Sequence, residues 1–179
     1  MARIQPPETD KVQERSQKIL DAIKAKSGRV PNIFKTMAHS PVALQAFVGL
    51  SEALASAKLP LRVREQIALT VAEDNQCHYC VAGHAAMGKK EGLAAEEIEG
   101  ARRARAADPK TNAILQFAKK VSAQRGNITD AELEIVLRAG CSEEEVFEIL
   151  TVVALNLFTN YFNHVADPAI DFPQVPPLA

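Results

Sequence analysis

Two thiols and an imidazole lie within eight residues of one another, in the sequence CHYCVAGH at residues 77–84. In a helix, Cys77, Cys80 and His84 would project from one face, because they stand at positions i, i+3 and i+7. A thiol is a useful nucleophile only as thiolate, and a neighbouring histidine or a helix N-terminus favours that form. A C-x-x-C pair can also close and open a disulfide with little backbone movement. The spacing therefore predicts redox chemistry.

In this redox interpretation, Cys80 and Cys77 are the nucleophile and the resolving thiol. His84 follows Cys80 by four residues, one helical turn, where it can reach the thiol directly or through water. Two carboxylates are candidates for completing a proton relay. Glu73 would lie one turn before Cys77 only if one helix ran unbroken between them, whereas Glu65 lies on the preceding helix and could fold across. Spacing alone does not choose between them.

Other interpretations of these residues remain open. Both cysteines could be structural, because a free cysteine is often a small buried hydrophobe, and His84 could be a half-buried histidine bonded to backbone. A structural zinc site would use both thiols and His84, and would need a fourth ligand from among His78, Glu73 and His164. No second C-x-x-C and no H-x-x-x-H motif is present, so we expect no metal.

Several nearby residues are weaker candidates for a substrate pocket. His78 and Tyr79 stand between the thiols and either shape the pocket mouth or cover the helix end. Tyr161 and His164 lie in a segment richer in polar and aromatic groups than a core helix needs. That segment could line a pocket or an oligomer seam, or be a helix end packed on a neighbour. Cys141 has no partner in the sequence and is expected to be a bystander.

Composition narrows the class of protein. The 179 residues are 47% hydrophobic with a formal net charge of -1, enough for a sizeable core and without the positive charge of a nucleic-acid surface. There is no Trp, so no base-stacking platform is expected. The N-terminus lacks the apolar run of a signal peptide, and the apolar stretch from Val146 to Phe158 is interrupted and too short for a bilayer. An odd number of cysteines does not suit a secreted disulfide framework. We therefore expect a cytoplasmic protein with no nucleic-acid or membrane partner.

Helical periodicity and capping signals cover almost the whole chain. We expect helices over residues 9 or 10–27, 30–34 and beyond, 41–54, 61–73, 77–88 or 92, 94–106, 109–126, 130–140 and 143–163, followed by an extended proline-rich tail from 167. The break at residues 74–76 would leave Cys77, and perhaps Cys80, in the opening turn of a helix, where unpaired backbone N–H groups favour an anion. No strand alternation or phosphate-binding glycine loop is found, so the fold class is all-α.

With these residues assembled, the chain resembles the carboxymuconolactone decarboxylase superfamily, and within it the AhpD-like alkylhydroperoxidase branch. The family pattern is a Glu, the first Cys of a C-x-x-C twelve residues later, and a His four residues after the second Cys. Glu65, Cys77, Cys80 and His84 satisfy it. The core resemblance covers about residues 40–125. The sequences VPNIF at 30–34 and NYFNH at 160–164 also look like the peroxidase-related members.

The resemblance implies a helical bundle built around a hairpin that carries the C-x-x-C motif. It implies one domain over 1–179, with an N-terminal arm (1–39), the core (40–125) and C-terminal helices with a tail (126–179), assembled as a homo-oligomer, a trimer or hexamer. Cys80 would attack a hydroperoxide and become a sulfenic acid, and Cys77 would condense with it to a disulfide. An external thiol or a lipoyl protein would reduce that bond. Glu65, chosen here over Glu73, and His84 would form the proton relay, with no cofactor.

One position departs from the family pattern. In the hydroperoxidase a His stands immediately before the second Cys, whereas this chain has Tyr79 there and His78 one residue earlier. On a helix that turns the imidazole by about 100°, so His78 does not simply replace the missing group. Two alternatives to a thiol peroxidase are therefore kept. One is a decarboxylase-like lyase acting on a small lactone acid through His84 and Glu65, and the other is a redox-sensing or zinc-binding module.

Overall fold

A computed structural model describes residues 2–178, and no strand occurs among them. The predicted all-α class is confirmed. In chain order the elements are the 3₁₀ turn η1 (Thr9–Lys11), α1 (Glu14–Ser27), α2 (Asn32–Met37), α3 (Pro41–Ala53), the 3₁₀ turn η2 (Leu54–Ser56), α4 (Leu61–Asp74), α5 (His78–Lys90), α6 (Ala95–Arg102), α7 (Pro109–Ala123), α8 (Asp130–Arg138) and α9 (Glu143–Ala166).

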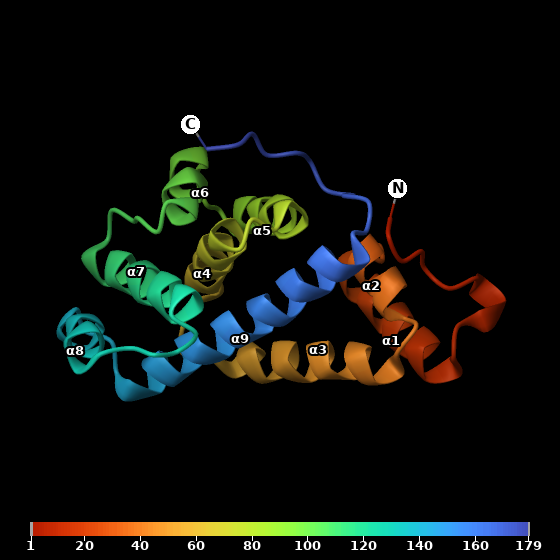
Figure 1. Cartoon of the computed structure of the whole chain (residues 1–179), viewed down its shortest axis with the longest axis horizontal. Coiled ribbons are helices and arrows are strands. Elements are labelled where there is room, and N and C mark those ends of the chain that lie inside the picture. Colours follow the sequence, from red (N-terminus) through yellow and green to blue (C-terminus); the bar gives the residue numbers. More distant parts are fainter. Residues whose placement is uncertain (1, 179) are drawn as a thin grey trace.

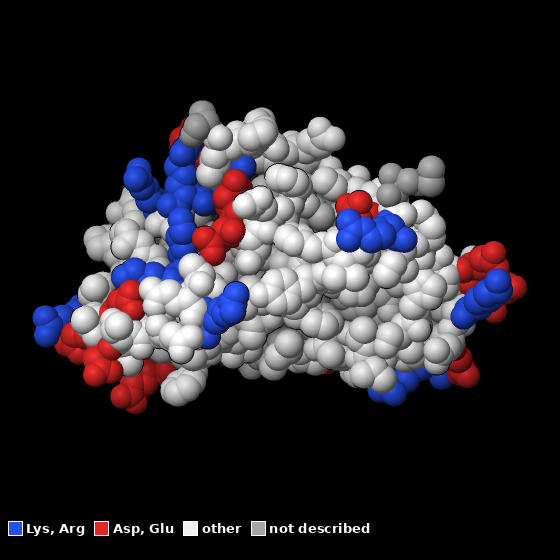
Figure 2. All heavy atoms as spheres, viewed as in Figure 1, with Lys and Arg blue, Asp and Glu red and all other residues white. Residues whose placement is uncertain are grey.

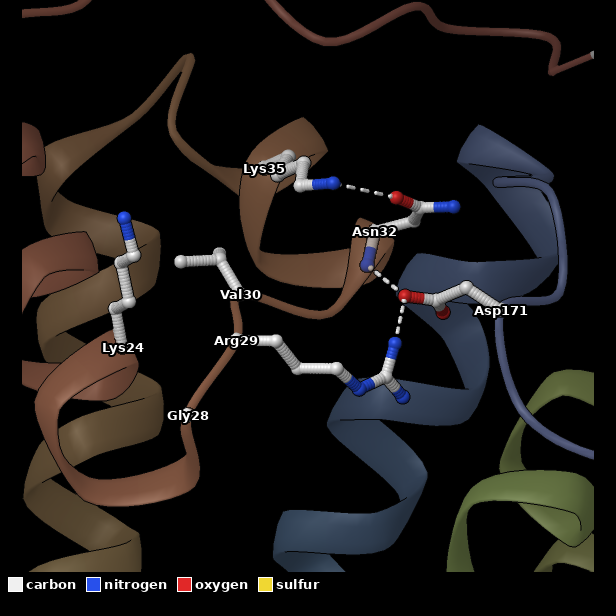
Figure 3. Close-up of a pocket in the computed structure, with 7 residues that line it drawn as sticks. All are labelled: Lys24, Gly28, Arg29, Val30, Asn32, Lys35 and Asp171. Atoms are coloured by element: carbon white, nitrogen blue, oxygen red, sulfur yellow. Dashed lines mark hydrogen bonds and ion pairs between the residues drawn. The ribbon is translucent and has the colours of Figure 1, made fainter.

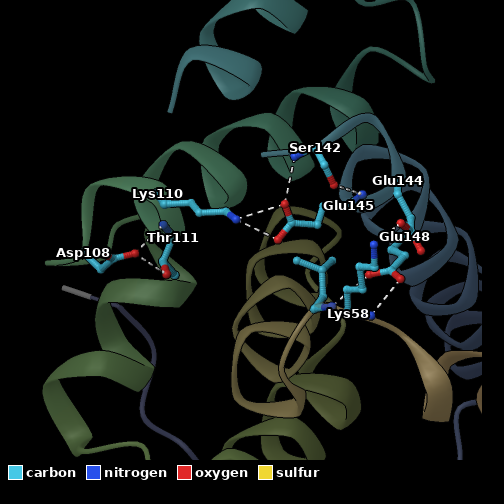
Figure 4. Close-up of polar contacts among 9 residues, drawn as sticks. Lys58, Asp108, Lys110, Thr111, Ser142, Glu144, Glu145 and Glu148 are labelled. Carbon is cyan, nitrogen blue, oxygen red and sulfur yellow. Dashed lines mark hydrogen bonds and ion pairs between the residues drawn. The ribbon is translucent and has the colours of Figure 1, made fainter. Parts of the chain in front are cut away.

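Four predicted helix starts are confirmed by side-chain caps. Ser40, Asp108, Thr129 and Ser142 each accept a hydrogen bond from the backbone N–H three residues later. At α8 and α9 a glutamate at the third helical position bonds back to the cap residue's own N–H, which completes a capping box. Figure 4 shows the caps of α7 and α9 side by side, joined by an ion pair between Lys110 and Glu145 at 2.7 Å.

Two predicted boundaries are wrong. The first helix was expected from residue 9 or 10, but η1 is separate and α1 begins only at Glu14, after Val12 turns extended. The helix expected over 94–106 ends at Arg102, because Ala104 adopts a left-handed φ of 55° and the Arg105 N–H closes on the Gly100 carbonyl at 2.8 Å. A left-handed residue other than glycine is uncommon, so nothing in the sequence signals this stop.

The centre of the bundle is the hairpin of α4 and α5. Every residue of α4 from Glu65 to Ala72 is buried, so this helix is surrounded on all sides. It packs against α5, α6, α7 and α9. Such complete burial is typical of the central helix of a bundle, and it explains why the apolar positions of α4 follow no single stripe.

Helix α9 crosses the bundle from α8 to α2 (Figure 1). Its 24 residues are long and apolar enough to cross a bilayer by length and composition, so the estimate from Val146 to Phe158 was too short. In the bundle it packs as a core helix against α4, α7 and α3. Glu148, which interrupts its apolar sequence, accepts the N–H groups of Lys58 and Leu59 at 2.8 Å each and so ties the start of α4 to α9 (Figure 4).

The last described residues, 167–178, form an extended segment that we call the strap. It leaves the end of α9, passes over α5 and reaches α6, as Figure 1 shows. Arg102 of α6 holds its far end through a hydrogen bond to the Pro176 carbonyl at 2.9 Å. The strap therefore covers one side of the helix that carries the C-x-x-C motif (Figure 1).

Candidate active site

The turn between α4 and α5 places both thiols at the start of a helix. Gln76 adopts a left-handed φ of 56°, and the Cys77 N–H then bonds to the Ala72 carbonyl at 2.8 Å. Cys77 thereby becomes the N-cap residue of α5, and Cys80 lies in its first turn. The prediction that the break near residue 75 leaves the thiols at a helix N-terminus is confirmed. Backbone N–H groups at that end favour negative charge on a nearby sulfur.

Cys77 and Cys80 form a disulfide, with their Cα atoms 5.3 Å apart. Both are buried, Cys77 at 1% exposure and Cys80 at 4%. The third cysteine, Cys141, is free and buried elsewhere, in a hydrophobic cluster that includes Val136 and Val146. The predicted redox pair is thus assembled, and the predicted bystander is not part of it.

Glu65 and His84 meet across the hairpin. His84 Nδ1 lies 2.8 Å from Glu65 Oε2, and both side chains are largely buried. An ionised carboxylate can only accept hydrogen bonds, so a Glu65 carboxylate would accept the Nδ1 proton, and the Nε2 atom of a neutral His84 would then be free to accept a proton. Because His84 also lies one turn after Cys80 on α5, the pair has the composition of a proton relay for the thiols.

A third group reaches the sulfurs from α9. Asn163 Nδ2 lies 3.1 Å from Cys80 Sγ and 3.9 Å from Cys77 Sγ, and Asn163 is 5% exposed. The sequence analysis pointed to the segment 160–164, but it chose Tyr161 and His164 and did not choose Asn163. The helical period could have found Asn163, because it shares one buried face with Asn156 and Asn160.

The other selected members of that segment do not reach the thiols. Tyr161 is 59% exposed, and His164 is exposed as well. On a helix these positions point away from the face that carries Asn160 and Asn163. The structure therefore places Tyr161 and His164 on an exposed face of α9, and within one protomer they do not share the buried surroundings of Cys80.

Tyr79 points away from the disulfide. Its hydroxyl donates to Asp171 Oδ1 of the strap at 2.6 Å and accepts the Ile33 N–H at 3.1 Å. Burial, together with the hydrogen bond to Asp171, raises the Tyr79 pKa far above its ordinary value. The phenol therefore stays protonated and has a structural role. His78 is exposed beside it and also makes no contact with the sulfurs among the hydrogen bonds of the described residues.

Asp171 is the point at which the strap is fastened over α5. Besides Tyr79, it accepts from Arg29 Nη1 at 2.7 Å and from the Asn32 N–H at 3.1 Å, as Figure 3 shows. The neighbouring Phe172 stacks edge-on against the Tyr79 ring, with centroids 5.6 Å apart. Tyr79 thus connects the N-terminal arm, the strap and the helix of the thiols.

Glu73 belongs to a different cluster. Its carboxylate pairs with Arg102 Nε at 2.7 Å and lines a polar cavity of about 450 Å³ with Arg105 and Lys119. The structure therefore brings Glu65, and not Glu73, to His84. Among the described residues no group of three or more His, Cys, Asp and Glu side chains could hold a metal ion, which gives the zinc alternative no support.

Comparisons with known proteins identify a family match and a shared fold. Residues 41–123 match the carboxymuconolactone decarboxylase family. The chain is similar to the crystal structure of an uncharacterised peroxidase-related protein with an alkylhydroperoxidase AhpD core from Ralstonia eutropha JMP134, at 26% identity, with a TM-score of 0.83 over 95% of this chain and 92% of that one. A peroxidase-related protein from Silicibacter sp. TM1040 has 24% identity and a TM-score of 0.83 over 94% and 91%.

A third solved structure shares the fold, but it is named for a different reaction. It is a variant of the debrominase Bmp8 in complex with 2,3,4-tribromopyrrole, at 21% identity with a TM-score of 0.79 over 94% of this chain and 91% of that one. No match was found among curated proteins. The fold therefore supports more than one chemistry, and the residues of the site must decide between them.

Proposed function

Because this chain belongs to the carboxymuconolactone decarboxylase superfamily, in its AhpD-like branch, we propose that it is a thiol-dependent peroxidase that reduces hydroperoxides through Cys77 and Cys80. One observation carries the proposal: the two sulfurs form a disulfide in the first turn of a helix whose next turn presents a histidine paired with a buried carboxylate. A lyase working through Glu65 and His84 alone would have no use for the sulfur pair.

The proposed cycle starts from the reduced pair. The Cys80 thiolate attacks the terminal oxygen of a hydroperoxide ROOH, the O–O bond breaks, and Cys80 becomes a sulfenic acid while RO⁻ takes a proton to leave as ROH. The proton comes from the relay of His84 and Glu65. The Cys77 thiol then attacks the Cys80 sulfur and releases water, which forms the disulfide seen in the structure.

The cycle needs an external reductant. A dithiol, either a small molecule or a lipoyl group on a protein, would attack the Cys77–Cys80 disulfide and regenerate both thiols by exchange through a mixed disulfide. The proposal places the protein in the cytoplasm, where thiol reductants are plentiful. Since both sulfurs are buried, exchange requires the site to open locally.

A single titration tests the cycle. The reduced protein receives one equivalent of cumene hydroperoxide, free thiols are counted before and after, and mass spectrometry locates any new bond. The proposal expects loss of two thiols as a Cys77–Cys80 disulfide, and a Cys80→Ser variant that consumes no peroxide. The proposal would be contradicted if both thiols remained free after the peroxide treatment while an alkylating reagent could still reach them. Lyase activity that persists when both cysteines are replaced would favour the decarboxylase alternative.

We also propose that the protein is a homo-oligomer. Three large hydrophobic side chains on the outer side of α9 are strongly exposed: Phe147, Tyr161 and Val165. Figure 2 shows that charged side chains gather toward the ends of one face and leave much of its centre uncharged. Large exposed hydrophobic side chains on one helix are typical of a surface that meets another subunit. Light scattering on the eluted protein tests this, and a monomer at micromolar concentration would contradict it.

A further inference from the structure

The hydrogen bond between Asn163 and Cys80 stands out because the disulfide gains little from it. The amide nitrogen lies 3.1 Å from Cys80 Sγ, well within the distance at which nitrogen donates to sulfur. A disulfide sulfur is a weak acceptor and carries no charge. Once the bond is reduced, the same N–H faces a thiolate, and a hydrogen bond to a charged acceptor is about twice as strong as a neutral one. The contact therefore favours the ionised form of Cys80.

The surroundings of Asn163 are hard to explain by stability. Asn163 Oδ1 and both polar side-chain atoms of Asn160 are buried and have no hydrogen-bond partner among the described residues. Leaving such a group unsatisfied is destabilising, so apolar residues would suit this part of the core better. By contrast, Asn156 lies on the same face, and its amide nitrogen donates a hydrogen bond to the Val152 carbonyl at 2.8 Å. Unpartnered amide atoms in the last turns of α9, beside an amide nitrogen that donates to Cys80 Sγ, indicate a functional requirement.

The contact is also asymmetric between the two thiols. Asn163 Nδ2 is 0.8 Å farther from Cys77 Sγ, at 3.9 Å against 3.1 Å. The helix N-terminus acts in the other direction, because Cys77 is the N-cap residue of α5 and would be the favoured thiolate in a bare C-x-x-C helix. Two local effects therefore compete. The N-terminus of α5 favours the Cys77 thiolate, and the Asn163 amide favours the Cys80 thiolate.

We propose that Asn163 is a catalytic residue that donates a hydrogen bond to the Cys80 thiolate and makes Cys80, rather than Cys77, the attacking thiol. This inference rests on the proposed function only in requiring that the disulfide be opened, and it holds for any electrophile that Cys80 attacks. It assigns a role in the site to a residue more than eighty positions from the motif in sequence.

The first test isolates one thiol and uses no peroxide. In a Cys77→Ser background, the rate of Cys80 alkylation by iodoacetamide is followed against pH, with mass spectrometry to identify the labelled residue. The midpoint of this pH profile reports the pKa of Cys80. Asn163→Leu should raise that midpoint by about 1 pH unit, which means a tenfold smaller fraction of thiolate at any pH below the midpoint. Asn163→Asp, which keeps the shape but brings a second negative charge, should raise it further. Asn156→Ala, the matched control on the same buried face, should leave it unchanged.

Other titrating groups are common to all these variants. Glu65 and His84 pair with each other on α4 and α5 and are left intact, and Tyr79 is held by Asp171 and stays protonated over the range. A purely structural role for Asn163 would affect unfolding without moving the midpoint. Equal midpoints in the parent, Leu and Asp forms would therefore overturn the proposal. If Asn163→Leu does not fold, Asn163→Ala removes the same donor without adding a charge and decides instead.

A second test asks which thiol reacts first. Fully reduced protein with both cysteines present is treated with a limiting amount of iodoacetamide, and the label is located by mass spectrometry. The proposal expects label on Cys80 in the parent protein and a shift toward Cys77 in Asn163→Leu. Label on Cys77 in the parent would overturn it. Neither test depends on peroxide consumption, so a failure of the proposed function and a failure of this inference can be told apart.

Discussion

His84 Nδ1 and Glu65 Oε2 are 2.8 Å apart although 19 residues separate them in the chain. Glu65 lies ten residues before Asn75 and His84 eight residues after Gln76, which puts them about 15 and 12 Å from the turn along their helices. Residues at similar distances from the turn of a helical hairpin face each other. This register brings Glu65 to the histidine and leaves Glu73, which lies close to the turn, to pair with Arg102.

The register gives a direct test of the proton relay. We expect Glu65→Gln to lower the rate of hydroperoxide reduction by about 10²–10⁴-fold, the range that positioned acid–base groups contribute. Glu73→Gln is the matched control, an identical change on the same helix, and should leave the rate within about twofold. Single-turnover peroxide consumption measures both, with thermal unfolding to confirm that each variant folds. Equal rates for the Glu65 variant and the parent would remove Glu65 from the mechanism.

Tyr79 should matter for stability and not for rate. Tyr79→Phe removes the donor to Asp171 and leaves the buried Ile33 N–H without its acceptor, so we expect unfolding to become easier by about 1–3 kcal/mol. The hydroxyl does not face the sulfurs, so peroxide turnover per folded molecule should not change. Urea unfolding and peroxide assays on the same samples separate the two effects. A rate loss without a stability loss would show that the phenol takes part in the chemistry.

Cys141 should react very slowly with thiol reagents in the folded protein. Burial raises the pKa of its thiol above the ordinary value, so at pH 7–8 even less of it is thiolate than in an exposed cysteine. We expect iodoacetamide to label Cys80 in the native reduced protein long before Cys141. The same reagent should label both in urea. If Cys141 reacted equally fast with and without urea, the core around it would have to be open.

Two helical glycines should respond oppositely to alanine. At Gly83 an added Cβ would lie 3.5 Å from the Phe172 ring, an ordinary contact, so Gly83→Ala should stabilise by about 0.5–1 kcal/mol through lower chain entropy. At Gly100 the Cβ would lie 2.9 Å from the Arg105 carbonyl oxygen. Since a backbone atom cannot easily move away, Gly100→Ala should destabilise by about 1–3 kcal/mol.

Urea unfolding of the two alanine variants gives both signs in one experiment. Each variant is its partner's control, because the chemical change is the same and both positions lie inside helices. A destabilised Gly83→Ala would mean that the strap presses more tightly on α5 than the contact distance indicates. A neutral Gly100→Ala would mean that the turn after α6 can relax.

Much of the site was predictable from the sequence because its parts are local. The C-x-x-C spacing, the break at residues 74–76 and the histidine one turn on lie within a dozen residues of each other, and helix geometry alone relates them. Helix caps such as Ser40 and Ser142 were predictable for the same reason. Each cap side chain accepts a hydrogen bond from the backbone N–H only three residues later, so the local sequence determines it.

What only the tertiary structure decided depends on how distant segments pack. The sequence marked residues 160–164 as unusual but did not show which face of α9 turns inward, and packing against α4 and α5 selects Asn163 while leaving Tyr161 exposed. Likewise, the sequence around Tyr79 does not predict its partner Asp171, because the two residues meet only when the strap folds back over α5. The sequence by itself determined the chemical groups and their local order, and long-range packing determined which of them share a site.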